Sequence, residues 1–241
     1  MVAIMVVAVT LGVPLVVLVC EALGAQSWSS VVDGSGDAIT NSLVLATAGA
    51  TAVVSLAVWL GYARARARGR IGQLADVLLL VVFAVPSTMV GVGLIGLWNR
   101  PGLLGTVYGT DVMFLLAYLA RFVPVAALAL AASARYVPLS HEEAAAVAGA
   151  GWLRTMSRIV LPQIRLGIVA AWVITFILAF GELGVSILVA PPGEATLPIR
   201  IYTIIANTPS SHVAVLALLQ TTVIFVPLAV LGALASVREA R

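Results

Sequence analysis

The stretch SHEEAAAVAGAGWLRTMSRIVLP, residues 140–162, differs in character from the chain around it. The 241 residues are 62% hydrophobic and 10% charged, and the mean hydropathy is +1.14. Soluble chains have about 45–50% apolar residues, so this composition predicts a membrane protein. The quoted stretch is then a polar element set between apolar segments.

The stretch predicts two short helices joined by a bend. Ser140 and Glu143 have the spacing of a capping box, which predicts a helix that begins at Ser140. Gly149 and Gly151 are expected to allow a sharp exit, because glycine accepts positive φ. A second helix is expected from Trp152 to about residue 160. Pro162 would then lie in the first turn of the next apolar segment, where its missing N–H costs little.

Six apolar segments are each long enough to cross a hydrocarbon layer of about 30 Å, which takes roughly 20 helical residues. They cover residues 2–23, 42–61, 71–97, 112–134, 163–190 and 213–237. Backbone polar groups in lipid must be satisfied internally, so each segment is expected to be a helix. The first segment is too long for a signal peptide and lacks its charged start, so we expect a retained helix. The predicted fold is an all-α polytopic membrane protein with a bundle of six transmembrane helices.

The arginines predict the orientation of this bundle. Ten of the thirteen fall in the loops and ends assigned to one side, namely Arg64, Arg66, Arg68, Arg70, Arg135, Arg154, Arg158, Arg165, Arg238 and Arg241. By the positive-inside rule, that side is cytoplasmic and includes the quoted stretch and both termini. Arg100 and Arg200 fall in loops on the opposite side, and Arg121 lies inside the fourth segment.

Composition also excludes several classes of protein. All thirteen basic residues are arginine, and a Walker A loop needs a lysine to hold nucleotide phosphates. One cysteine cannot form an intrachain disulfide, and with two histidines it makes no metal-ligand cluster. The net charge of +3 is too small, and the arginines too scattered, for a nucleic-acid surface. We therefore expect no cofactor, no metal and no catalytic residue.

Two ionisable residues, Arg121 and Glu182, lie deep inside predicted spans, away from their ends. Arg121 and Glu182 would sit about 13 Å and about 12 Å from the outer ends of consecutive helices, at about 1.5 Å per residue. Charges within spans cost roughly 2.5–3.5 kcal/mol each on insertion scales. We therefore expect the two side chains to face the bundle interior and to pair, directly or through one water. They are candidates for the solute pathway, and a purely structural pair is the alternative.

The pattern EAA, then G, then I-LP also carries a resemblance to a known family. Glu143-Ala144-Ala145, Gly149 and Ile159-Val160-Leu161-Pro162 match without a gap. The pattern resembles the signature of inner-membrane permease subunits of bacterial ATP-binding-cassette importers. Residues 83–98 and 116–130 resemble the third and fourth helices of that family. Residues 181–207 resemble the second half of ferric-iron-type permeases, and the similarity covers roughly residues 42–237.

The resemblance implies an architecture and a set of partners. Residues 38–237 would form the transmembrane domain, residues 1–37 an added first helix and outer loop, and residues 238–241 a cytoplasmic tail. The coupling segment, residues 138–162, would dock in a groove of a cytoplasmic ATPase dimer. The implied coupling residues are Glu143, Ala144, Ala145, Gly149, Ile159, Leu161 and Pro162. The other implied partners are a second permease half, an extracytoplasmic solute-binding protein and the lipid of a bacterial plasma (inner) membrane.

The leading interpretation is thus an importer permease whose substrate is ferric iron or another small solute. Ferric-type permeases are often a fused pair of such halves. This chain is one half, so either it pairs with a separate half or it lacks an N-terminal partner. Two alternatives are a proton-coupled secondary carrier that relies on Glu182 and an intramembrane enzyme. Neither has support in the sequence, which shows no inverted repeat and no nucleophile–base pair within a span.

Overall fold

The structure is a computed structural model that describes residues 2–25 and 27–239, and within them the regular structure is helical. Residues 240–241 of the predicted tail lie outside the described residues. The helices are α1 (Val2–Leu23), α2 (Trp28–Asp33), α3 (Gly36–Arg66), α4 (Gly69–Ala84), α5 (Ser87–Trp98), η1 (Leu103–Thr106), α6 (Val112–Arg135), α7 (Leu139–Val147), α8 (Trp152–Thr155), η2 (Met156–Val160), α9 (Leu161–Gln163), α10 (Arg165–Phe180), α11 (Ser186–Val189), α12 (Leu197–Ile204) and α13 (Ser210–Glu239). The chain divides into two compact units, Met1–Val44 with Pro191–Arg241, and Leu45–Ala190.

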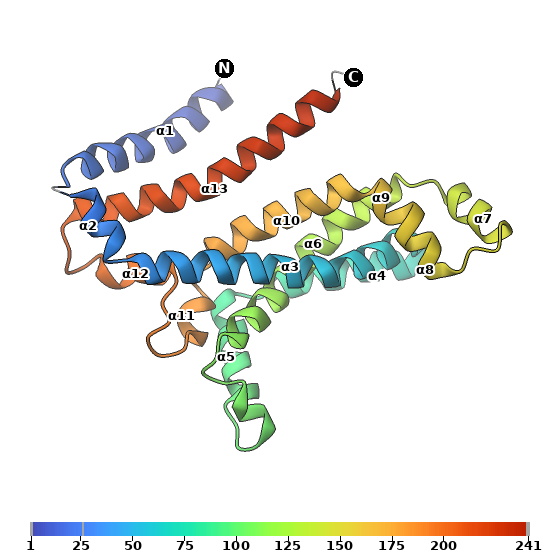
Figure 1. Cartoon of the computed structure of the whole chain (residues 1–241), viewed down its shortest axis with the longest axis horizontal. Coiled ribbons are helices and arrows are strands. Elements are labelled where there is room, and N and C mark those ends of the chain that lie inside the picture. Colours follow the sequence, from blue (N-terminus) through green and yellow to red (C-terminus); the bar gives the residue numbers. More distant parts are fainter. Residues whose placement is uncertain (1, 26, 240–241) are drawn as a thin grey trace. The chain divides into compact units, whose positions relative to one another are not determined.

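The first unit joins the two ends of the chain. α1 packs against α13, and α2 and α12 also contact α13 (Figure 1). Side-chain hydrogen bonds tie distant parts of the sequence together. Ser42 Oγ accepts the Leu197 N–H at 2.6 Å, and Asn41 donates to Glu194 at 2.7 Å. These bonds fix the loop before α12 against the start of α3.

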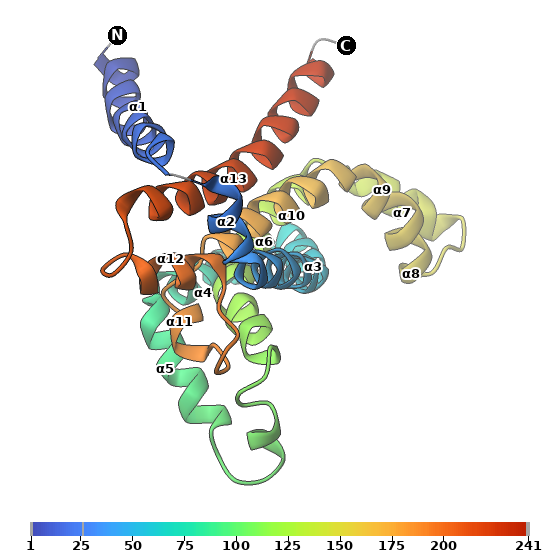
Figure 2. The ribbon, with the colours of Figure 1, turned by 60° about the vertical axis from the view of Figure 1, so that its left-hand side comes forward.

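In the second unit α6 is the central helix. It packs against α4, α5, α10 and α11, and it buries large apolar side chains, Phe114, Tyr118, Phe122 and Leu130 among them. α4 and α5 are separated by a bend of 88° (Figures 1 and 2). Within the described residues, three helices are long and apolar enough to cross a membrane, or five if each bent pair counts as one span.

Two of the expected spans are not continuous helices. The segment 71–97 breaks at Val85 and Pro86, which have extended backbones. A residue before proline is disfavoured in the α region, and proline has no N–H to donate. The segment 163–190 ends as a helix at Phe180 and resumes as the short α11 at Ser186. At the start of this segment the chain bends by 72°, where the helical residues Trp152–Gln163 meet Arg165–Phe180.

Candidate functional site

The bend between α7 and α8 is formed by the glycine that the EAA pattern singles out. Gly149 has φ of +76°. The N–H of Gly149 bonds to the Ala146 carbonyl at 3.0 Å, and that of Ala150 bonds to the Ala145 carbonyl at 2.9 Å. This pair of bonds is a Schellman motif, which ends a helix at a left-handed residue. Gly151 was expected to help in the same way, but its φ of −68° is open to any residue.

The start of α7 differs from the prediction. The helix begins at Leu139, its N-cap is Pro138, and no side chain caps it. Ser140 therefore lies inside the first turn and forms no capping box with Glu143. Proline at this position has an extended backbone, φ −61° and ψ 137°, and leads directly into a helix. Glu143 and Ala144 are consequently free on the exposed side of α7, whereas Ala145 is buried.

A polar anchor joins α7 to the end of α3. Glu142 accepts a hydrogen bond from Tyr62 Oη at 2.6 Å and forms an ion pair with Arg66. Arg66 also donates to the Val137 carbonyl at 3.2 Å. The Arg66 and Glu142 side chains are only 18% and 16% exposed, so this contact is shielded from water. Sequence reasoning missed it, because Arg66 was assigned only to a cytoplasmic loop and given no partner.

An apolar anchor holds the other arm of the bend. Met156, Val160 and Ile164 are buried together with Ala134 and Val137 at the end of α6. The helical turn Met156–Val160 is a π-helix, and it delivers these side chains to the core. Ile159 and Leu161 are half-buried. Pro162 was expected in the first turn of a straight span. It lies instead just before the bend at Ile164, and it is exposed.

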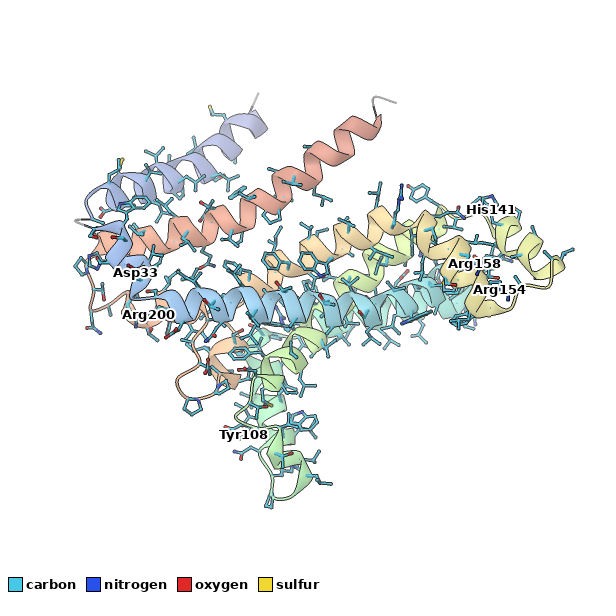
Figure 3. All side chains as sticks on the ribbon, in the orientation of Figure 1. Asp33, Tyr108, His141, Arg154, Arg158 and Arg200 are labelled. Carbon is cyan, nitrogen blue, oxygen red and sulfur yellow. The ribbon has the colours of Figure 1, made fainter. Side chains whose placement is uncertain are left out.

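The face of the bend that points away from these anchors is open. A hollow of ≈ 440 Å³ is lined by Gly149, Gly151, Leu153, Arg154, Ser157 and Arg158. Figure 3 shows Arg154 and Arg158 at the same end of the second unit as His141. Leu153, which lines the same hollow, is 68% exposed, and Val147 at the end of α7 is 91% exposed. The surface is thus cationic and apolar around a small-residue bend.

Arg121 and Glu182 lie together in the second unit. Arg121 Nη2 and Glu182 Oε2 are 3.7 Å apart, and the side chains are 16% and 10% exposed. The expected direct contact between them is therefore present. However, Glu182 does not lie in a helix, because α10 ends at Phe180.

Each member of this pair also satisfies a backbone group that a broken helix leaves free. Arg121 Nη1 donates to the Val85 carbonyl at 3.0 Å, at the break between α4 and α5. Glu182 Oε1 accepts the Val185 N–H at 3.0 Å, at the break between α10 and α11. Such groups are costly to leave unpaired in an apolar interior. The ion pair therefore links two breaks that are about 100 residues apart in sequence.

The chain segments at the two breaks also pack closely against each other at a glycine. A Cβ added to Gly184 would collide with Ser87 Oγ, the first residue of α5. Only a glycine lets the two chain segments approach this closely. The signals for this crossing were present in the sequence as Pro86 and as the glycines on either side of Glu182.

The remaining ionisable residues suggest no catalytic centre. Within the described residues, no group of three or more His, Cys, Asp or Glu side chains could hold a metal ion. His141 Nδ1 lies 3.3 Å from the Gln163 side chain on an exposed surface. His212 belongs to the other unit.

Comparisons with known proteins identify relatives across most of the chain. The family model for the binding-protein-dependent transport system inner membrane component matches residues 53–237. A Streptomyces antibioticus protein described as an ABC transporter permease is 32% identical over 187 residues, 76% of this chain and 80% of the relative. The molybdenum transport system permease protein ModB of Mycobacterium tuberculosis is 28% identical, over 93% of this chain and 88% of ModB. The Fe(3+)-transport system permease protein FbpB 2 of Haemophilus influenzae is 25% identical, over 80% of this chain and 38% of FbpB 2.

A solved structure has the same fold. It is a bacterial alginate ABC transporter in complex with a periplasmic protein, and its matched chain has a TM-score of 0.76 at 15% identity, with 95% of this chain and 89% of that chain covered. The bend, the broken spans and the matched residues lead to one conclusion: the chain belongs to the family of binding-protein-dependent transport system inner membrane components, the permease subunits of ABC importers.

Proposed function

We propose that this chain transmits the movement of a partner ATPase dimer to a solute pathway in the membrane, through the segment α7–bend–α8. The observation that carries the proposal is the contrast between the two faces of that segment. One face is fixed to α3 and α6 by the Glu142–Arg66 pair and by the Met156–Val160 core. The other face is open and combines Gly149, Arg154 and Arg158.

A segment with these two faces suits the transfer of force. Its anchored face moves with the helices, because buried polar and apolar contacts must shift together. Its open face offers a small-residue surface that a groove can approach closely, with arginines able to pair with carboxylates. On this proposal the seven residues of the EAA pattern divide between the tasks. Glu143, Ala144 and Gly149 face the ATPase. Ala145, Ile159 and Leu161 pack inward, and Pro162 lies just before the second bend, at Ile164.

The crossing at Arg121 and Glu182 is the candidate pathway element. Non-helical backbone at membrane depth is tolerated where it is buried in protein or lines a cavity, and broken helices are common near transporter binding sites. The pair would hold the two breaks in register as the bundle changes between its inward-facing and outward-facing states.

Orientation and partners follow from the same proposal. The arginine-rich ends and the α7–α8 segment would lie in the cytoplasm, and a solute-binding protein would dock on the opposite loops. A second permease half, identical or different, would complete the pathway in the plasma membrane.

The substrate class is a finer part of the proposal. ModB matches this chain over 88% of its own length, whereas FbpB 2 matches over only 38%. Sequence reasoning favoured ferric iron, but the fuller match favours a molybdate-like oxyanion. Uptake of labelled molybdate and of ferric iron by the reconstituted importer separates the two.

Binding of the ATPase tests the coupling proposal directly. The chain is co-expressed with its partner ATPase, and the amount of ATPase that copurifies is measured. Gly149→Leu should reduce this amount at least ten-fold, because leucine resists positive φ and projects from the open face. Gly109→Leu is the matched control, since Gly109 has φ of +78° and equally open surroundings on a loop assigned to the opposite side. Equal losses for the two variants would contradict the proposal.

A further inference from the structure

A separate hollow lies in the unit formed by residues 1–44 and 191–241. Its volume is ≈ 150 Å³, and it is lined by residues of α2, the turn before α3, α12, the loop after α12, and α13. By the same measure a single water needs only about 10–15 Å³, so the space suffices for an anion with four oxygens. Five polar residues line this space, which we call the Arg200 hollow: Ser30, Ser35, Arg200, Thr208 and His212. The Ser30 hydroxyl already donates to the Ser27 carbonyl at 3.1 Å.

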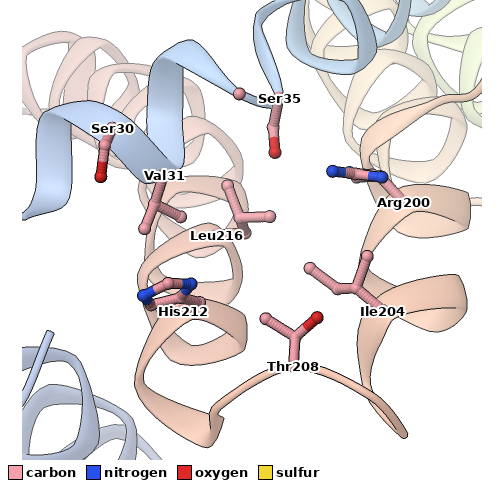
Figure 4. A pocket seen from close by; sticks show the side chains of 9 residues that line it. Ser30, Val31, Ser35, Arg200, Ile204, Thr208, His212 and Leu216 are labelled. Atoms are coloured by element: carbon pink, nitrogen blue, oxygen red, sulfur yellow. The ribbon is translucent and has the colours of Figure 1, made fainter.

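Two polar groups of the Arg200 hollow point into it. Figure 4 shows the Arg200 guanidinium and the Ser35 hydroxyl directed toward the space, with the His212 ring on α13 at its edge. Val31, Ile204 and Leu216 close the remaining walls with apolar surface. No carboxylate lines this space itself.

The two cationic or potentially cationic side chains lack partners of their own. Among the described residues, neither Arg200 nor His212 takes part in an ion pair, and neither side chain forms a hydrogen bond. Both are half-buried. Asp33 and Asp37 line a neighbouring hollow that also includes Arg200, and Figure 3 shows Asp33 near Arg200 within this unit. Neither carboxylate comes within the 4.0 Å that an ion pair requires.

The backbone that carries Arg200 is held in place. Ser42 Oγ accepts the Leu197 N–H at the start of α12, and the Arg200 N–H bonds to the Thr196 carbonyl at 2.8 Å. Ser35 is 6% exposed and precedes α3. Arg200 and His212 are therefore presented by helices, which reduces the entropy cost of binding. Ser35 lies in the turn before α3, and Thr208 lies in the loop between α12 and α13.

We infer that the Arg200 hollow is a binding site for a small oxyanion of the sulfate or molybdate class. Arg200 supplies the charge and paired N–H donors. Ser35, Thr208 and His212 supply single donors to the remaining oxygens. The inference does not depend on the coupling proposal, because it concerns a site that can be measured without an ATPase.

Equilibrium dialysis of the purified full-length chain in lipid nanodiscs, with labelled sulfate and labelled molybdate, tests the site. We expect saturable binding of at least one anion. Arg200→Gln should weaken it at least ten-fold, His212→Gln about three-fold, and Arg200→Lys less than Arg200→Gln because the charge remains. Arg100→Gln is the matched control, since Arg100 is exposed, lies just after α5 and donates to the Gly96 carbonyl of that helix.

Three outcomes would overturn the inference: no saturable binding by the wild-type chain, unchanged binding by Arg200→Gln, or an equal loss for Arg100→Gln. Size-exclusion chromatography checks that each variant is folded. If Arg200→Gln does not fold, Arg200→Lys still tests the site. Competition with acetate distinguishes a carboxylate ligand from an inorganic oxyanion. Displacement of sulfate by acetate at lower concentration than by molybdate would assign the hollow to a carboxylate group and would contradict an inorganic ligand.

Discussion

The bend after α7 and the break after α10 both turn near a glycine, but the two glycines are needed for opposite reasons. Gly149 has a positive φ, and a Cβ added there would meet nothing within 4 Å. Gly184 has no positive φ, yet a Cβ there would collide with Ser87 Oγ. The first glycine sets a backbone conformation on an open surface, and the second allows a close approach inside the second unit. A turn on an open surface and a turn packed inside the fold are thus distinguishable by the space around one carbon atom.

The largest loss of stability should come from removing the Arg121–Glu182 ion pair at the break after α10. Arg121→Leu leaves Glu182 buried without its partner, which should lower the free energy of unfolding by about 3–5 kcal/mol. Glu182→Leu should cost a similar amount. In the double variant the loss should be clearly smaller than the sum of the two single losses, because no charge is left unpaired.

SDS titration of the protein in mixed micelles measures these three losses. Uptake by the reconstituted importer provides a second readout. Strictly additive losses would show that Arg121 and Glu182 act independently, and the two breaks would then be held by packing alone.

A smaller effect is expected when the break after α10 is overpacked. Gly184→Ala must displace Ser87, and overpacking of this kind costs about 1–3 kcal/mol. Gly93→Ala is the control, because a Cβ at Gly93 meets nothing within 4 Å. Thermal unfolding in detergent should separate the two variants, and equal midpoints would show that α5 and the break after α10 are not in close contact.

The smallest effect on stability is expected at the bend after α7, which contains Gly149. Gly149→Ala places a Cβ on a left-handed residue, which costs about 1–2 kcal/mol, and nothing else changes. Gly151→Ala should be neutral or slightly stabilising, since φ at Gly151 is −68°. The same thermal measurement applies, and a loss for Gly151→Ala equal to that for Gly149→Ala would remove the distinction between the two positions.

The local parts of this architecture could be predicted from the sequence. The apolar segments predict the helices, because length and composition alone mark them, and the position of Gly149 predicts the bend. The contact between Arg121 and Glu182 followed from the cost of charges in apolar segments. These features depend on the residues of a single segment, or on the general free-energy cost of a charge in an apolar segment.

The parts that depend on tertiary structure could not be predicted in the same way. The Glu142–Arg66 pair joins residues 76 positions apart, and no periodicity connects them. The capping box at Ser140 was wrong because Pro138 starts the helix earlier. The breaks at Pro86 and Glu182 were overlooked because long apolar runs were treated as straight spans. A proline in the middle of such a run, or a charged residue between glycines, deserved more weight than hydropathy.

The angle between Trp152–Gln163 and α10 has a mechanical consequence. Twelve helical residues extend about 18 Å at about 1.5 Å per residue, and they meet α10 at a bend of 72°. A pivot of this arm at Ile164, together with the end of α6 on which it packs, would act as a lever. A rotation of about 10° would sweep the far end, beside Gly149, through about 3 Å for an arm of that length. Conversely, a displacement of a few ångströms near Gly149 would change the angle to α10, whose other end adjoins the break at Glu182.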